Sequence, residues 1–224
     1  MQKLFAFAVP GEAQDGLWQR WRELYPVTGL WPFLSSAGPD ELARRRERLA
    51  PAPDPDAVVA ELVAVQRVEE PYLAELDLPA LVADLAANPP APLPGGAAER
   101  LRRGWRDVRW LCLADTAEGG WELPLLLGRP RAANLVTSRH QGLDPVHHAA
   151  FLHSWYRRFG ACVRGLHGSW LDLVVDAPPT DPAEIAAVAV EQWAYCDDML
   201  QTVGLPAKVA RNQAPADQWY IWWD

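Results

Sequence analysis

The sequence has little cysteine and no closely spaced cysteine pair. Its three cysteines, Cys112, Cys162 and Cys196, are odd in number and widely separated along 224 residues. Zinc-binding modules place cysteines a few positions apart, and disulfide frameworks need a dense, even set. The sequence therefore predicts three buried thiols rather than a zinc site or a disulfide-stabilised fold.

Long apolar runs are also missing, although 50 % of the residues are hydrophobic. A membrane-spanning helix needs roughly 18 consecutive apolar residues, and no stretch approaches that length. The apolar segment near the start carries one lysine and stops at Pro10, so it is too short for a signal peptide and favours a strand. We therefore expect no membrane span and a cytoplasmic location.

Positive charge is scarce, and lysine is almost absent. Lysine and arginine together number 21 against 29 acidic residues, and 19 of the 21 are arginine. The formal net charge of −8 disfavours a nucleic-acid partner, because cations must displace counterions from phosphates. Arginines surround Trp105 and Trp110 in a pattern that can bind single strands, but we expect them to pair with acidic helices. Rare lysine with abundant alanine and proline indicates a GC-rich bacterial genome.

Motifs for cofactors and for common catalytic sites are missing. The sequence has no glycine-rich phosphate loop, no dinucleotide-binding fingerprint and no Gly-x-Ser-x-Gly turn. Four of five histidines lie between residues 140 and 153, but His147 and His148 are each more than about 100° round a helix from His153. Zinc-binding helical pairs are three or four positions apart. His140 could still approach His147 through a loop. We expect no metal and no cofactor.

Apolar periodicity and capping signals predict a helix-rich N-terminal α/β segment over residues 1–92. The predicted elements are a strand at Leu4–Val9, a helix capped by Asp15, a strand at Leu30–Leu34 and helices at about Pro39–Leu49, Asp56–Glu69 and Leu78–Ala87. The stretch Asn88–Gly96 is too rich in proline and glycine for a regular element. It predicts a boundary near residue 92.

The same signals predict an α+β domain over residues 93–224. The predicted elements are strands at Val108–Ala114 and Trp121–Leu127 around a turn at Ala117–Gly120, a helix at Pro145–Phe159 capped by Asp144, strands at Ala161–Leu166 and Trp170–Val175, a helix from Asp181 to near Gln201, and a strand at Gln218–Trp223. If Leu123–Leu127 or Asn134–Thr137 supplies a strand before the first helix, the order is β-α-β-β-α-β. That order is typical of a ferredoxin-like sandwich.

Several of these segments resemble an uncharacterised bacterial family, domain of unknown function 4253, which is common in actinobacteria. The matching pieces are Trp155–Ala161, Leu171–Val175 with Pro178-Pro179, Glu191–Asp198 and Trp222–Asp224. Their order and spacing cover roughly residues 120–224. Members have an acid just after the strand turn where this chain has Ser169, so no role of that acid carries over. The resemblance implies a fold and carries no established activity.

Acids and aromatics on the last predicted helix form a candidate site. At about 100° per residue, Glu191, Tyr195 and Asp198 share one flank with Glu184. Carboxylates beside an apolar surface can serve as general acid or base, or can hold a divalent cation. The alternative is a solvated edge whose charges meet arginines of neighbouring elements, namely Arg157, Arg158 or Arg164.

Tryptophan is abundant, with 12 residues, and its position in the last strand is informative. Alternation puts Trp219 and Trp223 on one face and Trp222 on the other. A large core is the favoured interpretation, but an exposed Trp222 would mark a binding surface. Asn134 follows an Arg-Pro-Arg loop that could bind an anion near a helix start, although an ordinary polar loop is the favoured interpretation.

These observations favour a non-enzymatic, cytoplasmic module that binds a protein or a small ligand through acidic and aromatic residues. The candidate binding residues are Glu191, Tyr195, Asp198, Trp222 and Asn134. The alternative is a hydrolase that uses Glu191 and Asp198 as a carboxylate pair, with or without a divalent metal. A pocket joining those acids to a histidine would favour the enzyme.

Overall fold

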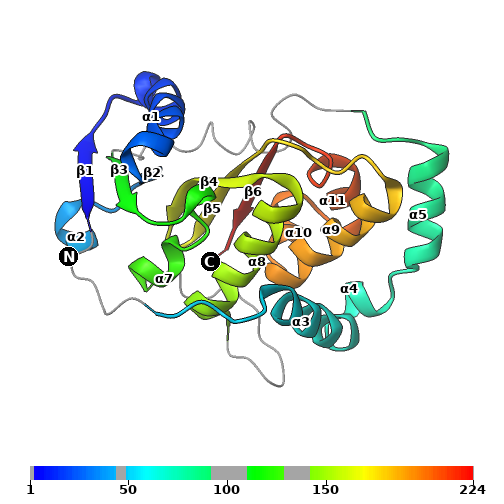
Figure 1. Ribbon diagram of the computed structural model, residues 1–224. Helices are drawn as coiled ribbons and strands as arrows, with labels where there is room; N and C mark the ends of the chain where they lie inside the picture. The colour runs from blue at the N-terminus through cyan, green and yellow to red at the C-terminus, as the bar shows by residue number, and fades with distance from the viewer. Residues whose placement is uncertain (1–2, 44–48, 92–109, 129–141, 224) are drawn as a thin grey trace.

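The computed structural model describes residues 3–43, 49–91, 110–128 and 142–223. The described strands form one six-stranded mixed sheet in the order β1-β3-β2-β4-β5-β6. The strands are β1 Leu4–Ala8, β2 Leu30–Ser35, β3 Trp110–Asp115, β4 Ala161–His167, β5 Trp170–Val175 and β6 Gln218–Trp222. Helices pack on this sheet, so the α+β class is confirmed (Figure 1).

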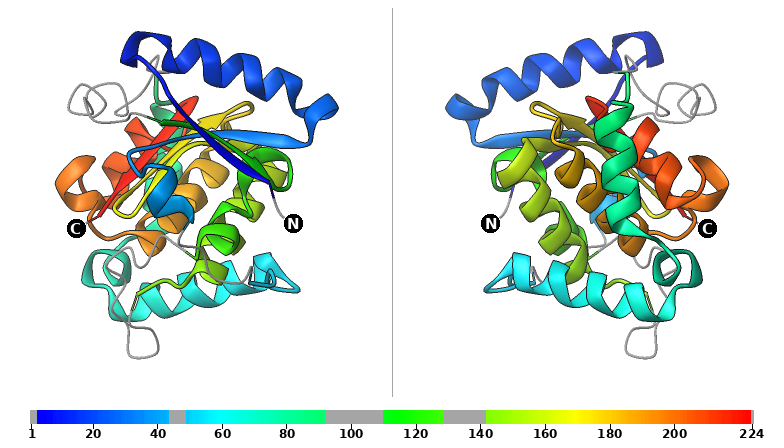
Figure 2. Two further views of the ribbon diagram at one scale, coloured as in Figure 1. Left: turned by 90° about the vertical axis from the view of Figure 1, so that its left-hand side faces the viewer. Right: turned by 90° about the vertical axis from the view of Figure 1, so that its right-hand side faces the viewer.

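The helices lie in layers on either side of the sheet (Figure 2). The longer ones are α1 Gln14–Thr28, α3 Pro55–Glu69, α5 Leu78–Ala87, α8 Pro145–Phe159 and α9 Pro182–Tyr195. Shorter ones are α2 Pro39–Ala43, α4 Pro71–Ala74, α7 Leu123–Leu127, α10 Met199–Thr202 and α11 Pro206–Asn212, with 3₁₀ turns η1 Gly11–Ala13 and η2 Glu118–Gly120. Helix α1 lies on one side of the sheet and α8 and α9 on the other, with α3 beyond them as an outer layer.

The sheet takes strands from both predicted parts of the chain. Strand β3 pairs antiparallel with β1 on one side and β2 on the other, and β2 runs parallel to β4 through Leu34 and Gly165. The indole N–H of Trp31 on β2 also donates to the carbonyl of Val163 on β4 at 2.8 Å. Division of the chain near residue 92 stays a prediction, but the described strands on both sides of it belong to one sheet.

Helix α8 has the predicted cap at each end. Asp144 accepts backbone N–H groups of Val146 and His147, Pro145 fills the first helical position, and Gly160 ends the helix at φ 60°. Asp181 caps α9 in the same way. Helix α8 is buried on more than one side because the sheet covers one face and α3 another.

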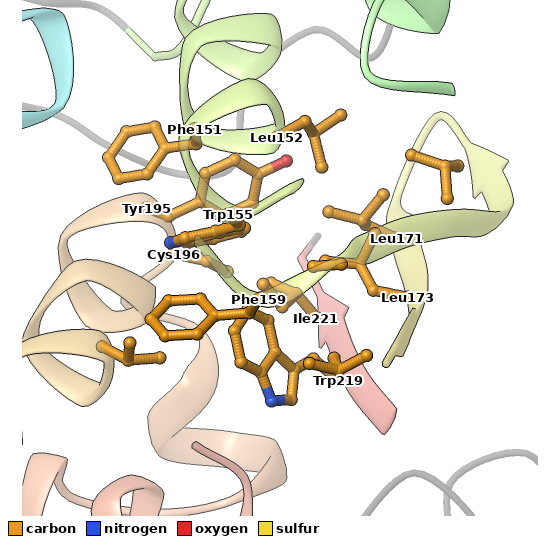
Figure 3. Packing of buried hydrophobic residues seen from close by; sticks show 14 of the residues in the cluster. Phe151, Leu152, Trp155, Phe159, Leu171, Leu173, Tyr195, Cys196, Trp219 and Ile221 are labelled. Atoms are coloured by element: carbon orange, nitrogen blue, oxygen red, sulfur yellow. The ribbon is translucent and has the colours of Figure 1, made fainter. Parts of the chain in front are cut away.

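The core between sheet and helices is strongly aromatic (Figure 3). The rings of Trp155 on α8 and Tyr195 on α9 lie 5.4 Å apart, and Trp219 of β6 meets Trp155 edge-on at 5.6 Å. Trp219 and Trp223 are both buried on this side, as strand alternation predicts, while Trp222 is half-buried. Cys112, Cys162 and Cys196 are buried free thiols, as expected.

The predicted strand at Trp121–Leu127 is wrong, and so is the hairpin turn before it. Residues Glu118–Gly120 form the 3₁₀ turn η2, and Leu123–Leu127 form helix α7, which ends at Gly128 with φ 60°. A short leucine run has no periodicity that separates strand from buried helix. Pro124 at the helix start and Gly128 at its end were the overlooked signals. The other strand candidate, Asn134–Thr137, lies outside the described residues, and the ferredoxin-like order is not confirmed.

One predicted helix is shorter than expected, and a second is described only in part. Helix α9 ends at Tyr195 rather than near Gln201, because Cys196 takes an extended conformation and donates its thiol to the carbonyl of Trp222 at 3.3 Å. This contact ties the chain to β6 before α10 begins. Helix α2 is described for Pro39–Ala43, and residues 44–48 lie outside the described ranges. Within the ranges described, no helix combines the length and apolar character needed to cross a membrane.

Candidate functional site

A groove of about 350 Å³ runs between α3, α8 and α9. Its walls are mainly aliphatic, with a few charged side chains among them. The lining residues are Asp56, Val59, Ala60, Val63, Arg67, Leu78, Ser154, Arg158, Ala187, Val190 and Glu191. Concave, mostly apolar sites between helices, with a small number of polar groups, are typical of small-ligand binding.

Helix α3 forms one wall of the groove with a single stripe of side chains. Asp56, Val59, Ala60, Val63 and Arg67 are spaced by three, four, seven and eleven positions from the first, so they share one face. At 1.5 Å per residue the stripe extends about 16 Å along the helix axis. An acid therefore lies at its beginning and an arginine at its end.

Glu191 on α9 is held by two residues of α8. The indole N–H of Trp155 donates to Oε2 at 2.8 Å, and Nη1 of Arg158 donates to Oε1 at 2.7 Å and to Oε2 at 2.9 Å. The side chain of Glu191 is 13 % exposed and that of Arg158 is 31 % exposed. A carboxylate with both oxygens occupied is suited to fixing the geometry of the wall, not to taking a proton from a substrate.

Asp56 is likewise paired, with a residue of α8 that lies beside the groove. It forms an ion pair with Arg157. The hydrogen bond from Arg157, followed by one from Ser154, lowers the pKa of Asp56 below its ordinary value. Both acids of the groove are thus neutralised by neighbouring arginines.

Arg67 differs from the other charged residues of the groove. In the part of the chain that the structure describes, it has no acidic partner, and its side chain is exposed. Glu70, one turn further on, directs its carboxylate to the backbone N–H of Leu73 at 2.8 Å. Within the described part of the chain, Arg67 is therefore the charged lining residue that is left without an oppositely charged partner.

Comparison with known proteins finds a family match over the part of the chain that supplies α8 and α9. Residues 120–224 match the model of a family described as Domain of unknown function (DUF4253). The match covers the same range as the resemblance seen in the sequence. No curated protein and no solved structure matches the chain.

The matched segment contributes Ser154, Arg158, Ala187, Val190 and Glu191 to the groove, whereas α3 and α5 precede that segment in the chain. The groove is therefore formed where the matched segment meets helices that precede it. Arg67 and the aliphatic stripe of α3 were missed by sequence reasoning. The helical spacing of these residues was the available signal. That spacing does not indicate which other helices pack against the stripe to form the groove.

The other predicted site residues do not line this groove. Tyr195 is buried in the core, with its hydroxyl 2.6 Å from Nδ1 of His148, and burial raises its pKa well above the ordinary value. Asp198 lies beyond the end of α9 and accepts from the amide of Gln201 at 2.8 Å. Trp222 is half-buried at the end of β6. Asn134 lies outside the described residues.

The early end of α9 explains why the predicted carboxylate flank does not form. Glu191 and Tyr195 are one helical turn apart, but the extended Cys196 moves Asp198 off the helix. Asp197 next to it is half-buried, and burial together with the charge of Asp198 raises its pKa. Glu191 and Asp198 thus belong to different elements with different partners.

The three histidines of α8 have different partners. His147 completes the capping box of α8, His148 bonds Tyr195 in the core, and His153 stacks on Trp121 with ring centroids 4.0 Å apart. Among the described residues, no three histidine, cysteine, aspartate or glutamate side chains are placed to hold a metal ion together. His140 lies outside those residues.

Proposed function

We propose that this protein is a non-enzymatic binding module whose ligand site is the groove between α3, α8 and α9. The observation that carries the proposal is an open, aliphatic groove whose two acids are already paired with arginines. Such walls offer apolar contact area and fixed geometry to a ligand. They do not offer an unpaired nucleophile or base.

The hydrolase alternative has weaker support. It needs Glu191 and Asp198 to act as a pair, with one of them able to exchange a proton. Glu191 accepts three hydrogen bonds from Trp155 and Arg158, and Asp198 lies at the start of α10. No observation in the described residues favours the enzyme over the binding module.

The cellular setting is part of the same proposal. Three buried free thiols fit a reducing compartment, which agrees with a bacterial cytoplasm. A net charge of −8 fits a partner other than nucleic acid. A ferredoxin-like arrangement of the C-terminal half also stays a proposal.

The proposal can be tested with a neutral fluorescent probe and two matched variants. N-phenyl-1-naphthylamine, which fluoresces in apolar surroundings, is expected to bind the protein reversibly. Ala60→Trp fills the groove from an exposed position of α3, and Ala64→Trp adds the same side chain at an exposed position of that helix outside the groove. Probe binding is expected to be lost in the first variant and kept in the second. Equal binding by both variants would place the probe elsewhere and reject the groove as the site.

A further inference from the structure

The charges around the groove indicate what kind of ligand it takes, and this inference rests on the proposed function. Asp56 is paired with Arg157, and Glu191 is paired with Arg158. These two pairs contribute no net charge to the walls. Arg157 lies outside the lining, so the lining itself holds two acids and two arginines, and of these four Arg67 has no acidic partner among the described residues.

The position of Arg67 gives the groove a direction. It ends the stripe of α3, two helical turns beyond Ala60 and one turn beyond Val63. The dipole of α3 explains why a cation is favourable in its last turn. It does not explain why the cation lies on the same face as the aliphatic stripe, where a ligand lying along the stripe would reach it.

The apolar part of the groove comes from three helices. Val59 and Val63 of α3 face Val190 of α9, and Leu78 at the start of α5 also lines the groove. A ligand tail that covers these side chains removes apolar surface from water, which is the main source of affinity in such sites. The paired acids and arginines keep the walls in place without requiring contact with the ligand.

We propose that the groove binds a small amphipathic monoanion, an aliphatic carboxylate whose tail lies along Val59, Val63 and Val190 and whose head group meets Arg67. A guanidinium presents a planar pair of N–H donors that matches the two oxygens of a carboxylate. One unpaired guanidinium suits one carboxylate. A dianionic phosphate would require a second unpaired cation, and Arg158, the other arginine that lines the groove, already has an acidic partner.

A series of eight-carbon ligands that differ only in the head group tests this inference. Octanoate, 1-octanol and octylammonium are titrated against the bound naphthylamine probe at low salt, using the unmodified protein, Arg67→Gln and Arg20→Gln. Arg20 is an exposed arginine of α1, outside the groove, so its variant makes the same charge change elsewhere.

The expected result is a change specific to one ligand and one variant. Arg67→Gln should weaken octanoate binding about threefold to fivefold, the upper part of the range of an exposed ion pair, and leave octanol unchanged. Arg20→Gln should behave as the unmodified protein. High salt should remove most of the difference.

Other outcomes separate this inference from the proposed function. If Arg67→Gln leaves octanoate binding unchanged, or if octylammonium binds more tightly than octanoate, the anion inference is overturned while the groove remains a ligand site. If the probe fails to bind the unmodified protein, and none of the three ligands produces a heat of binding in calorimetry, both the inference and the proposed function fail.

Discussion

The indole N–H of Trp155 donates a 2.8 Å hydrogen bond to the carboxylate of Glu191 and so ties α8 to α9 beside the groove. The same carboxylate accepts from Arg158. Two helices that both contribute to the wall are therefore held by one side chain that is largely out of water. Charge-assisted hydrogen bonds of this kind are stronger than neutral ones because the acceptor is ionised.

Replacement of Glu191 by glutamine is expected to lower the free energy of unfolding by about 1–3 kcal/mol. The amide presents one acceptor and one donor group where Trp155 and Arg158 both donate. Urea unfolding at pH 7.5 provides the measurement. Glu184→Gln makes the same change at an exposed position of α9 and should shift stability by less than about 0.5 kcal/mol. Equal effects of the two substitutions would contradict the role assigned to Glu191.

The buried His148 predicts a stability loss in mild acid. Burial lowers its pKa from 6.5 to about 3. His148 in the unfolded chain therefore binds a proton below about pH 6.5, whereas His148 in the folded protein binds one only below about pH 3. The contribution of His148 to stability is complete above pH 6.5 and decreases as the pH falls toward 3. Between pH 7 and pH 5 this amounts to about 2 kcal/mol.

Urea unfolding of the unmodified protein and of His148→Gln at several pH values isolates this contribution. The variant keeps a group that can hydrogen-bond Tyr195 but has no proton to gain. Its stability should be lower at pH 7.5 and should change less between pH 7 and pH 5. Parallel pH dependences of the two proteins would show that another group is responsible.

Two glycine substitutions should change stability in opposite directions. Gly120 has φ 69°, and a Cβ there would lie 2.5 Å from Cδ1 of Trp31, whose indole bonds Val163. Gly120→Ala should therefore lower the free energy of unfolding by about 2 kcal/mol or more. Gly16 lies inside α1, and a Cβ there would meet no atom of another element within 4 Å, so Gly16→Ala should raise stability by about 0.5–1 kcal/mol. Thermal unfolding of both variants provides the measurement. A Gly120→Ala protein as stable as the unmodified one would contradict the close contact between Gly120 and the Trp31 ring.

The ion pair between Arg164 and Asp172 on adjacent strands is almost fully buried, with side chains 6 % and 3 % exposed. Nε of Arg164 donates to Oδ2 of Asp172 at 2.7 Å. Asp172→Asn removes the buried charge paired with Arg164, leaves among the described residues only the exposed Asp15, 3.2 Å from its Nη1, and should lower stability by about 3–5 kcal/mol. A double-mutant cycle with Arg164→Met measures the coupling. The double variant is expected to lose less free energy of unfolding than the sum of the two single losses. Additive losses would show that the residues act independently.

Elements marked by local signals could be predicted from the sequence. The Asp-Pro starts of α8 and α9 and the Gly160 end of α8 depend on residues within a few positions of each helix end, so they need no knowledge of the fold. The start of β5 after its turn follows the same logic. Helix α7 has such signals in Pro124 and Gly128, but its five residues are too few to show a helical period, so the segment resembled a strand. The end of α9 depends on the contact between Cys196 and Trp222, which only the tertiary fold supplies.

The candidate site could be predicted only in part. Glu191 stood out because it lies beside an apolar helix face, and it does line the groove. Its partner Trp155 and the opposite wall on α3 come from distant parts of the chain, so spacing along one helix could not reveal them. Tyr195 fulfils a core role instead, since its ring direction on α9 places the hydroxyl at His148.

The bond between Trp31 and Val163 joins residues 132 positions apart, where β2 meets β4. During synthesis at roughly 5–20 residues per second, β2 leaves the ribosome about 7–26 s before its parallel neighbour β4 does. Throughout that interval the nascent strand has one edge without its final partner. An unpaired strand edge can pair with another chain, so we expect the yield of folded protein to depend on translation speed and on chaperones as well as on the stability of the finished sheet.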